Sequence, residues 1–133
     1  MGKIMGLDVG TKRIGVSLSD PMHIIAQPNC VIQRTSDDIA IQKIIEICNN
    51  NQVEKIVIGL PKNMNGTIGP QAQNCIDFAD RLKDFDIIFE DERLTSHQAE
   101  TILKDLNKKY TKDKGQVDIK SACIILQQYL DRR

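Results

Sequence analysis

The sequence contains few aromatic residues, so its hydrophobic core has to be built mainly from aliphatic side chains. Aromatic residues make up 4% of the 133 residues, and tryptophan is absent. Hydrophobic residues make up 41%, which excludes a disordered chain and leaves isoleucine, leucine and valine as the main core formers. A chain of this length predicts a single domain, over residues 1–133, with a substantial core.

Three further absences narrow the class of protein. The 18 basic and 18 acidic side chains cancel, so overall charge does not predict nucleic-acid binding, and any basic surface has to be local. The cysteines at positions 30, 48, 75 and 123 form no CxxC pair, which favours reduced, buried thiols. No stretch approaches the ~20 apolar residues that a membrane-spanning helix needs. We therefore expect a soluble, cytoplasmic protein with no membrane contact.

The hydrophobic pattern predicts a mixed α/β domain. We expect strands over residues 4–9, 14–18, 24–32, 53–60 and 85–90. We expect helices over 35–51, 70–82, 95–106 and from about 118 to the C-terminus, with a lysine-rich loop over 107–116. A tight turn joins the first two strands, and three strands in succession suggest a meander with antiparallel pairing, whereas helices link the later strands, which favours parallel pairing. The expected fold class is α/β, with a mixed five-stranded sheet flanked by helices.

A carboxylate interrupts the apolar pattern of the first predicted strand. Asp8 lies near the end of that strand, where an ionised side chain is costly unless a cation lies beside it. One alternative is that Asp8 pairs with Lys12 or Arg13 across the turn, and the other is that it binds a metal ion. The glycines of this segment leave room for a phosphate or a substrate to approach the backbone.

Further acidic residues follow the last predicted strand and begin the last predicted helix. In helix-linked parallel sheets, ligands collect at the carboxyl ends of the strands, where we expect Asp8, Asp91 and Glu92. Asp118 falls on the apolar face of the last helix, where it either points inward or caps the helix. Carboxylates without histidine or cysteine suit Mg²⁺ or Mn²⁺ rather than zinc. Two such ions activate water and stabilise the leaving oxygen in phosphodiester hydrolysis.

Four segments together resemble the YqgF family, also called RuvX, which consists of bacterial proteins with an RNase H-like fold. They begin at Gly6, Val57, Asp91 and Val117 and read GLDVGTKRIGVSLSD, VIGLPKNMNG, DERLTS and VDIKSACIILQQYLD. The resemblance spans nearly the whole chain and implies a nuclease, a phosphodiester hydrolase acting in 5′-end maturation of pre-16S ribosomal RNA. The family's relation to the resolvase RuvC implies cleavage of Holliday junctions as an alternative.

The resemblance implies a site of three carboxylates. Asp8 matches the family's acid on the first strand, Glu92 its central acid and Asp118 its acid on the last helix. These three residues are the expected catalytic residues and metal ligands, holding Mg²⁺ or Mn²⁺ as a pair of ions. Asp91 competes with Glu92, because neighbouring residues of a strand face opposite sides and only one of the two reaches the metals.

Polar and basic residues near these acids are expected to contact the substrate. The candidates are Thr11, Lys12, Arg13, Arg93, Lys112 and Lys114. Arg13 has the alternative of pairing with Asp8 or Asp20, and the lysine-rich segment has the alternative of being a solvated loop.

The expected partner is a nucleic acid, with precursor ribosomal RNA favoured over branched DNA. Both bind through phosphates, so the residues barely distinguish them. A non-catalytic RNA-binding assembly factor is a third alternative. The sequence leaves open whether the protein is a monomer or a homodimer.

Overall fold

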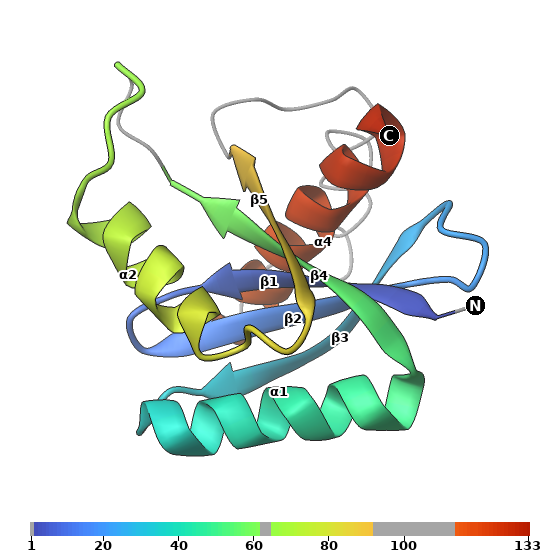
Figure 1. Cartoon of the computed structure of the whole chain (residues 1–133), viewed down its shortest axis with the longest axis horizontal. Coiled ribbons are helices and arrows are strands. Elements are labelled where there is room, and N and C mark those ends of the chain that lie inside the picture. The colour runs from blue at the N-terminus through green and yellow to red at the C-terminus, as the bar shows by residue number, and fades with distance from the viewer. Residues whose placement is uncertain (1, 62–64, 92–113) are drawn as a thin grey trace.

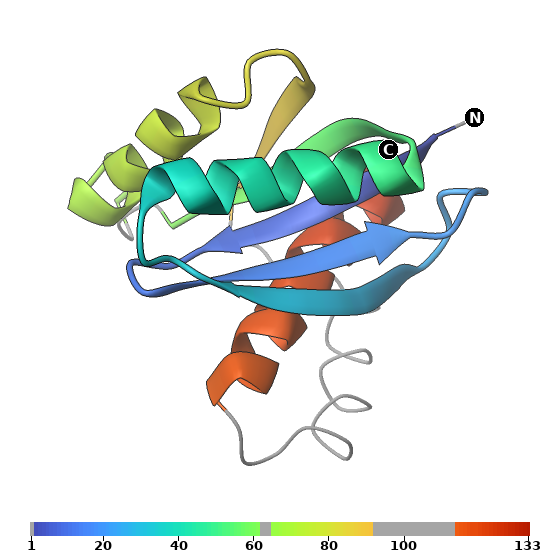
Figure 2. The same ribbon diagram turned by 90° about the horizontal axis from the view of Figure 1, so that it is seen from below.

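A β-sheet lies between two layers of helices (Figures 1 and 2). The computed structural model describes residues 2–61, 65–91 and 114–133, with side chains from Asp118 onward in the last segment. The strands are β1 (Lys3–Val9), β2 (Arg13–Ser19), β3 (Ala26–Gln33), β4 (Val53–Leu60) and β5 (Asp86–Asp91). The described helices are α1 (Asp37–Asn51), α2 (Pro70–Asp80) and α4 (Lys114–Arg132).

The sheet has five strands in the order β3-β2-β1-β4-β5, which confirms the predicted fold class. The first three strands pair antiparallel, while β4 pairs parallel with β1 and β5 pairs parallel with β4. Figure 2 shows α1 and α2 on one face of the sheet and α4 crossing the other. The carboxyl ends of β1, β4 and β5 therefore lie at the same end of the sheet, as expected for a site.

Local sequence signals explain two helix starts. Ser36 caps α1, and its hydroxyl accepts a hydrogen bond from the backbone N–H of Ile39 over 3.2 Å. Pro70 occupies the first turn of α2, where the missing N–H costs nothing. Both features match the predicted helices.

The third strand begins two residues later than predicted, at Ala26. The physical reason is the carboxylate of Asp20, which accepts hydrogen bonds from the backbone N–H groups of Met22, Ile24 and Ile25. These bonds hold the first residues of the expected strand in a turn and lower the pKa of Asp20. Asp20 is therefore a turn residue.

The last helix begins one turn earlier than predicted, at Lys114. Asp118 consequently lies inside α4, so the alternative that it caps the helix is wrong. Lys114 and Gln116 are good helix formers, and the single glycine between them costs only about 1 kcal/mol. The expected helix over 95–106 lies outside the described residues.

Two apolar clusters fill the spaces above and below the sheet. The larger one packs the sheet against α1 and α2, and the smaller one packs it against α4. Phe78 is the largest fully buried side chain, and aliphatic residues make up most of both clusters, as the scarcity of aromatics predicts. The cysteines are free thiols, and burial raises the pKa of Cys48 and Cys123 to about 12. Of the described helices, none has the length and apolarity to span a membrane.

Helix α4 rests directly on the backbone of β1 and β2 at two glycines. A Cβ atom added at Gly15 would lie 2.0 Å from the backbone oxygen of Asp118, and one added at Gly6 would lie 2.6 Å from Cβ of Leu126. The Ser17 hydroxyl lies beside Gly6, its partner in the β1–β2 ladder, and donates a hydrogen bond to the carbonyl of Ala122 over 2.8 Å. Glycine therefore fixes how close α4, and Asp118 with it, comes to the sheet.

Replacing Gly15 with alanine should displace the first turns of α4. The added methyl group meets backbone rather than a movable side chain, so we expect Gly15→Ala to lower the free energy of unfolding by about 1–3 kcal/mol. Urea unfolding followed by circular dichroism measures this loss. Ser17→Ala, which removes a donor without adding a clash, should cost about 1 kcal/mol. Unchanged stability of Gly15→Ala would show that α4 does not depend on this close approach.

Candidate active site

Asp8 faces α4 because side chains alternate along β1. Met5 and Leu7 pack into the cluster under α1 and α2, whereas Ile4 packs into the cluster under α4. Asp8 lies four residues after Ile4, so it shares the face of Ile4, and it lines a pocket together with residues of α4. The carboxylate predicted at the end of the first strand therefore points towards the last helix.

Helix α4 brings Asp118 and Ser121 to the same place. These residues lie three positions apart and so share one side of the helix. The side chain of Ser121 forms a hydrogen bond with the carboxylate of Asp8, and the charge of Asp118 acts on the same carboxylate. Two of the three predicted acids, distant in the sequence, are thus neighbours in the structure.

The pKa of Asp8 is raised from 3.8 to about 6. Burial is the largest cause, because it removes the water that would solvate a charged carboxylate. The negative charge of Asp118 raises the pKa further, while the hydrogen bond from Ser121 lowers it. Strong perturbation by burial together with a like charge is typical of functional sites.

Arg13 pairs with Asp118. Its Nε donates to Oδ2 of Asp118 over 2.8 Å, and the two side chains are 31% and 24% exposed. The alternative that Arg13 pairs with Asp8 or Asp20 is therefore wrong. Because β1 and β2 are adjacent, antiparallel strands, Arg13 reaches the start of α4 beside Asp8. Among the described residues, Asp118 therefore has a cationic partner, whereas Asp8 has no ion pair with a basic side chain.

Glu90 is a third carboxylate at this place that the sequence analysis missed. It lines the same pocket of about 260 Å³ as Asp8 and Ser121, and it is only 3% exposed. Arg132 forms an ion pair with Glu90, and Nε2 of Gln128 donates to its Oε2 over 3.1 Å. The alternation of side chains along β5 could have identified Glu90. Ile88 packs against the α4 cluster, and Glu90, two residues later, lies on the same face of the strand.

The choice between Asp91 and Glu92 falls at the limit of the described chain. Asp91 ends β5, and its backbone carbonyl accepts a hydrogen bond from Nε2 of Gln128 over 3.0 Å. Its neighbour Glu90 faces α4, so strand alternation directs the side chain of Asp91 to the other face. Glu92 lies outside the described residues.

The remaining substrate candidates lie in three places. Thr11 and Lys12 are exposed in the turn between β1 and β2, which a hydrogen bond from Gly10 N–H to the Arg13 carbonyl closes over 2.9 Å. Lys114 is the first residue of α4, and its side chain is not described. Arg93 and Lys112 lie outside the described residues.

The described carboxylates suit a hard divalent cation, although they do not complete a site. No group of three His, Cys, Asp or Glu side chains within the described ranges is arranged to hold a metal ion. Asp8 and Asp118 nevertheless place two oxygen donors together, and their mutual repulsion raises the pKa of Asp8. A cation between them would relieve that repulsion. The expected third ligand, Glu92, is not described, so metal binding remains a prediction.

The fold is that of RuvC and the RNase H-like proteins. The chain is similar to the Fowlpox virus resolvase solved with substrate Holliday junction DNA, with a TM-score of 0.61 and 10% identity over 98% of this chain and 97% of that one. It is also similar to T. thermophilus RuvC in complex with a Holliday junction substrate, with a TM-score of 0.59 and 10% identity over 98% of this chain and 95% of that one. At such low identity these likenesses describe the fold alone.

The chain belongs to the RuvX family. The family's sequence profile, described as "Holliday junction resolvase", matches residues 2–132. Two relatives named "Putative pre-16S rRNA nuclease" support this assignment. The one from Clostridioides difficile (strain 630) is 46% identical, over 98% of this chain and 94% of its own length. The one from Roseiflexus sp. (strain RS-1) is 43% identical, over 98% of this chain and 94% of its own length. The resemblance seen in the sequence is thereby confirmed.

Replacing Asp8 with asparagine should stabilise the protein at neutral pH. The pKa of Asp8 is higher in the folded protein, about 6, than the ordinary 3.8, so the unmodified protein loses stability as pH rises through this interval. Asp8→Asn should therefore raise the free energy of unfolding at pH 7.5 by up to about 3 kcal/mol, with little gain near pH 3.5. Urea unfolding with a chelator present measures both values.

The matched control is Asp84→Asn, which removes an exposed carboxylate from the turn after α2. It should change stability little at either pH. A gain for Asp8→Asn that is the same at both pH values would contradict the assignment of the cost to a buried charge.

Proposed function

We propose that the protein is a metal-dependent nuclease that hydrolyses phosphodiester bonds, acting in the cytoplasm in 5′-end maturation of pre-16S ribosomal RNA. The observation that carries the proposal is the placement of Asp8 beside Asp118 in the fold of RuvC. A buried carboxylate kept beside a second negative charge, with its pKa raised to about 6, is most simply explained by a function that needs its charge. This argument favours an enzyme over a non-catalytic RNA-binding assembly factor.

Asp8 and Asp118 would hold Mg²⁺ or Mn²⁺ together with Glu92. When bound, such ions supply a water of lowered pKa and neutralise charge on the leaving oxygen. Glu90 is less suited to be a ligand, because Arg132 and Gln128 already occupy its oxygens. We assign Glu90 to fixing the end of β5 against α4.

Four neighbouring side chains would orient the acids and the substrate. Ser121 holds the carboxylate of Asp8 by a hydrogen bond, and Arg13 holds Oδ2 of Asp118. The side chain of Arg13 is 31% exposed, so it can also contact a phosphate beside the acids. The exposed Thr11 and Lys12 extend this polar surface around the turn.

Precursor ribosomal RNA is the favoured substrate, because relatives that match this chain almost end to end carry the name of a pre-16S rRNA nuclease. The family description gives branched DNA as the second candidate. A chemistry of phosphates and carboxylates alone does not separate RNA from DNA, so the substrate has to be tested directly.

A cleavage assay tests the proposed activity. We expect cleavage of precursor 16S RNA near its 5′ end with Mg²⁺ or Mn²⁺, and a loss of at least about 100-fold in Asp8→Asn and in Asp118→Asn. Asp84→Asn should cleave at the unmodified rate, since its carboxylate lies outside the site. A four-way DNA junction is assayed in parallel.

The two substrates separate the candidate functions. Cleavage of the junction alone would replace the RNA proposal with resolution of branched DNA. Cleavage of neither, by a folded protein with either metal, would exclude the nuclease and leave the assembly factor.

Metal binding can be measured separately from activity. Titration of Mn²⁺ followed by electron paramagnetic resonance should show binding to the unmodified protein and to Asp84→Asn. Asp8→Asn should bind at least about tenfold more weakly, because it removes one anionic donor. Equal Mn²⁺ affinity in all three proteins would place the metal elsewhere.

A further inference from the structure

The face of the sheet opposite α4 carries an apolar hollow at the sheet edge. It has a volume of about 430 Å³ and lies between the second half of α2 and β5. Its apolar lining consists of Ile76, Ala79, Phe85, Ile87 and Phe89. Phe89 is 39% exposed, which is unusual for a large aromatic side chain in a chain with so few of them. The hollow is separate from the pocket of Asp8, which lies on the α4 face.

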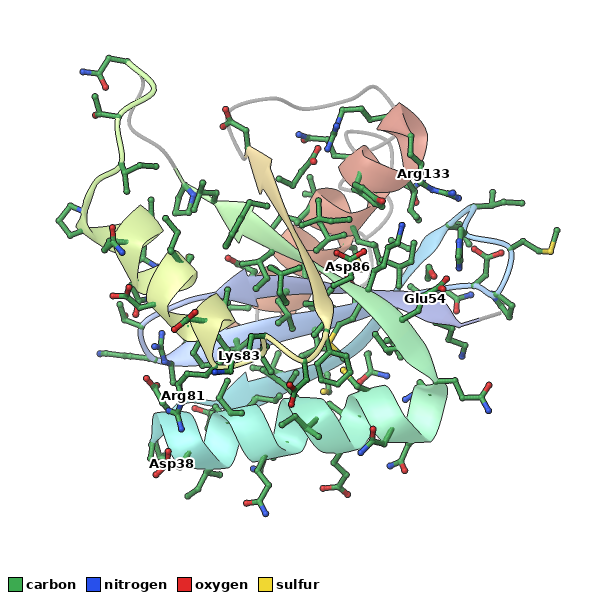
Figure 3. The ribbon with its side chains drawn as sticks, viewed as in Figure 1. Asp38, Glu54, Arg81, Lys83, Asp86 and Arg133 are labelled. Atoms are coloured by element: carbon green, nitrogen blue, oxygen red, sulfur yellow. The ribbon has the colours of Figure 1, made fainter. Side chains whose placement is uncertain are left out.

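The rim of this hollow is acidic. Its described lining includes the exposed carboxylates of Asp77, Asp80 and Asp86 and one ammonium group, that of Lys83. Figure 3 labels Lys83, in the turn that follows α2, and Asp86, the first residue of β5. An acidic rim around an apolar floor disfavours nucleic-acid phosphates and favours a ligand that is both cationic and apolar.

The hollow adjoins a strand with one open side. Within the described part of the chain, β5 is hydrogen-bonded to β4 alone and ends the order of the sheet. An edge strand presents N–H and C=O groups that can pair with an added strand. Ile87 and Phe89 alternate on the hollow's side of β5, so a strand added there would direct every second side chain towards the same hollow.

We propose that β5 and this hollow bind an extended, basic segment of another protein by addition of a strand. Backbone pairing with β5 would supply affinity, apolar side chains of the segment would fill the hollow, and lysine or arginine would meet the acidic rim. The charges on the rim also act against pairing between two copies of this chain, since like charges would meet. The surface does not depend on the nuclease, so either proposal can fail without the other.

Short extended peptides in which lysine or arginine alternates with leucine, isoleucine or phenylalanine are suitable probes. We expect saturable binding by members of this set, with NMR shifts at the methyl groups of Ile87 and the ring of Phe89. Peptides with serine in place of the apolar residues carry the same charge and should not bind. If no peptide of the set binds saturably, the proposal is overturned.

Charge reversal tests the rim. Asp80→Lys should weaken peptide binding at least about tenfold, and it should fold because a cation is favourable at the end of a helix. Glu46→Lys makes the same charge change on the exposed side of α1, away from the hollow, and should bind normally. Both variants should retain nuclease activity. Equal peptide binding by the two variants would show that the acidic rim does not bind the peptide.

Backbone methylation tests strand addition. Only every second amide of an added strand points at β5, so N-methylation of one alternate set should weaken binding at least about tenfold, while the other set should be tolerated. Equal effects of the two sets would overturn pairing with β5. A single-stranded RNA that shifts the Ile87 and Phe89 resonances at lower concentration than the peptides would identify the surface as a nucleic-acid site and overturn the proposal.

Discussion

The candidate site depends on the direct contact between helix α4 and the backbone of β1 and β2. Gly6 and Gly15 carry no side chain at the crossing, and beside Gly6 the Ser17 hydroxyl donates a hydrogen bond to the Ala122 carbonyl. A side chain at either glycine would push the helix away from the sheet and take Asp118 away from Asp8. The same contact therefore determines both how the second helical layer packs and whether two acids meet.

The meeting of these acids has an energetic cost that nearby residues only partly offset. Arg13 neutralises Asp118, and Ser121 donates to Asp8, but burial and the charge of Asp118 still raise the pKa of Asp8 to about 6. The fold thus maintains a carboxylate whose charged form is unfavourable without a cation. Such a conflict between stability and local chemistry is expected at functional sites rather than in a structural core.

The sheet separates two kinds of surface. Its α4 face carries the carboxylates, Arg13 and the pocket that Glu90 lines, whereas its other face carries the apolar hollow with the acidic rim beside β5. Strand alternation produces this separation, because Ile88 and Glu90 of β5 face α4 while Ile87 and Phe89 face the hollow. One strand can therefore support chemistry on one side and recognition on the other.

The sequence alone determined the succession of strands and helices along the described chain, the mixed pairing of the five strands, a hydroxyl cap at the start of α1 and the unusual position of Asp8, because these follow from local patterns of period two or 3.6 and from turn residues. It did not determine that Arg13 pairs with Asp118, or that Glu90 lies in the pocket and pairs with Arg132. Those features arise from contacts between residues far apart in the chain, and local propensity contains no information about which distant side chains meet. Only the tertiary packing of α4 against the sheet, at the two glycines of β1 and β2, decided which of these side chains meet.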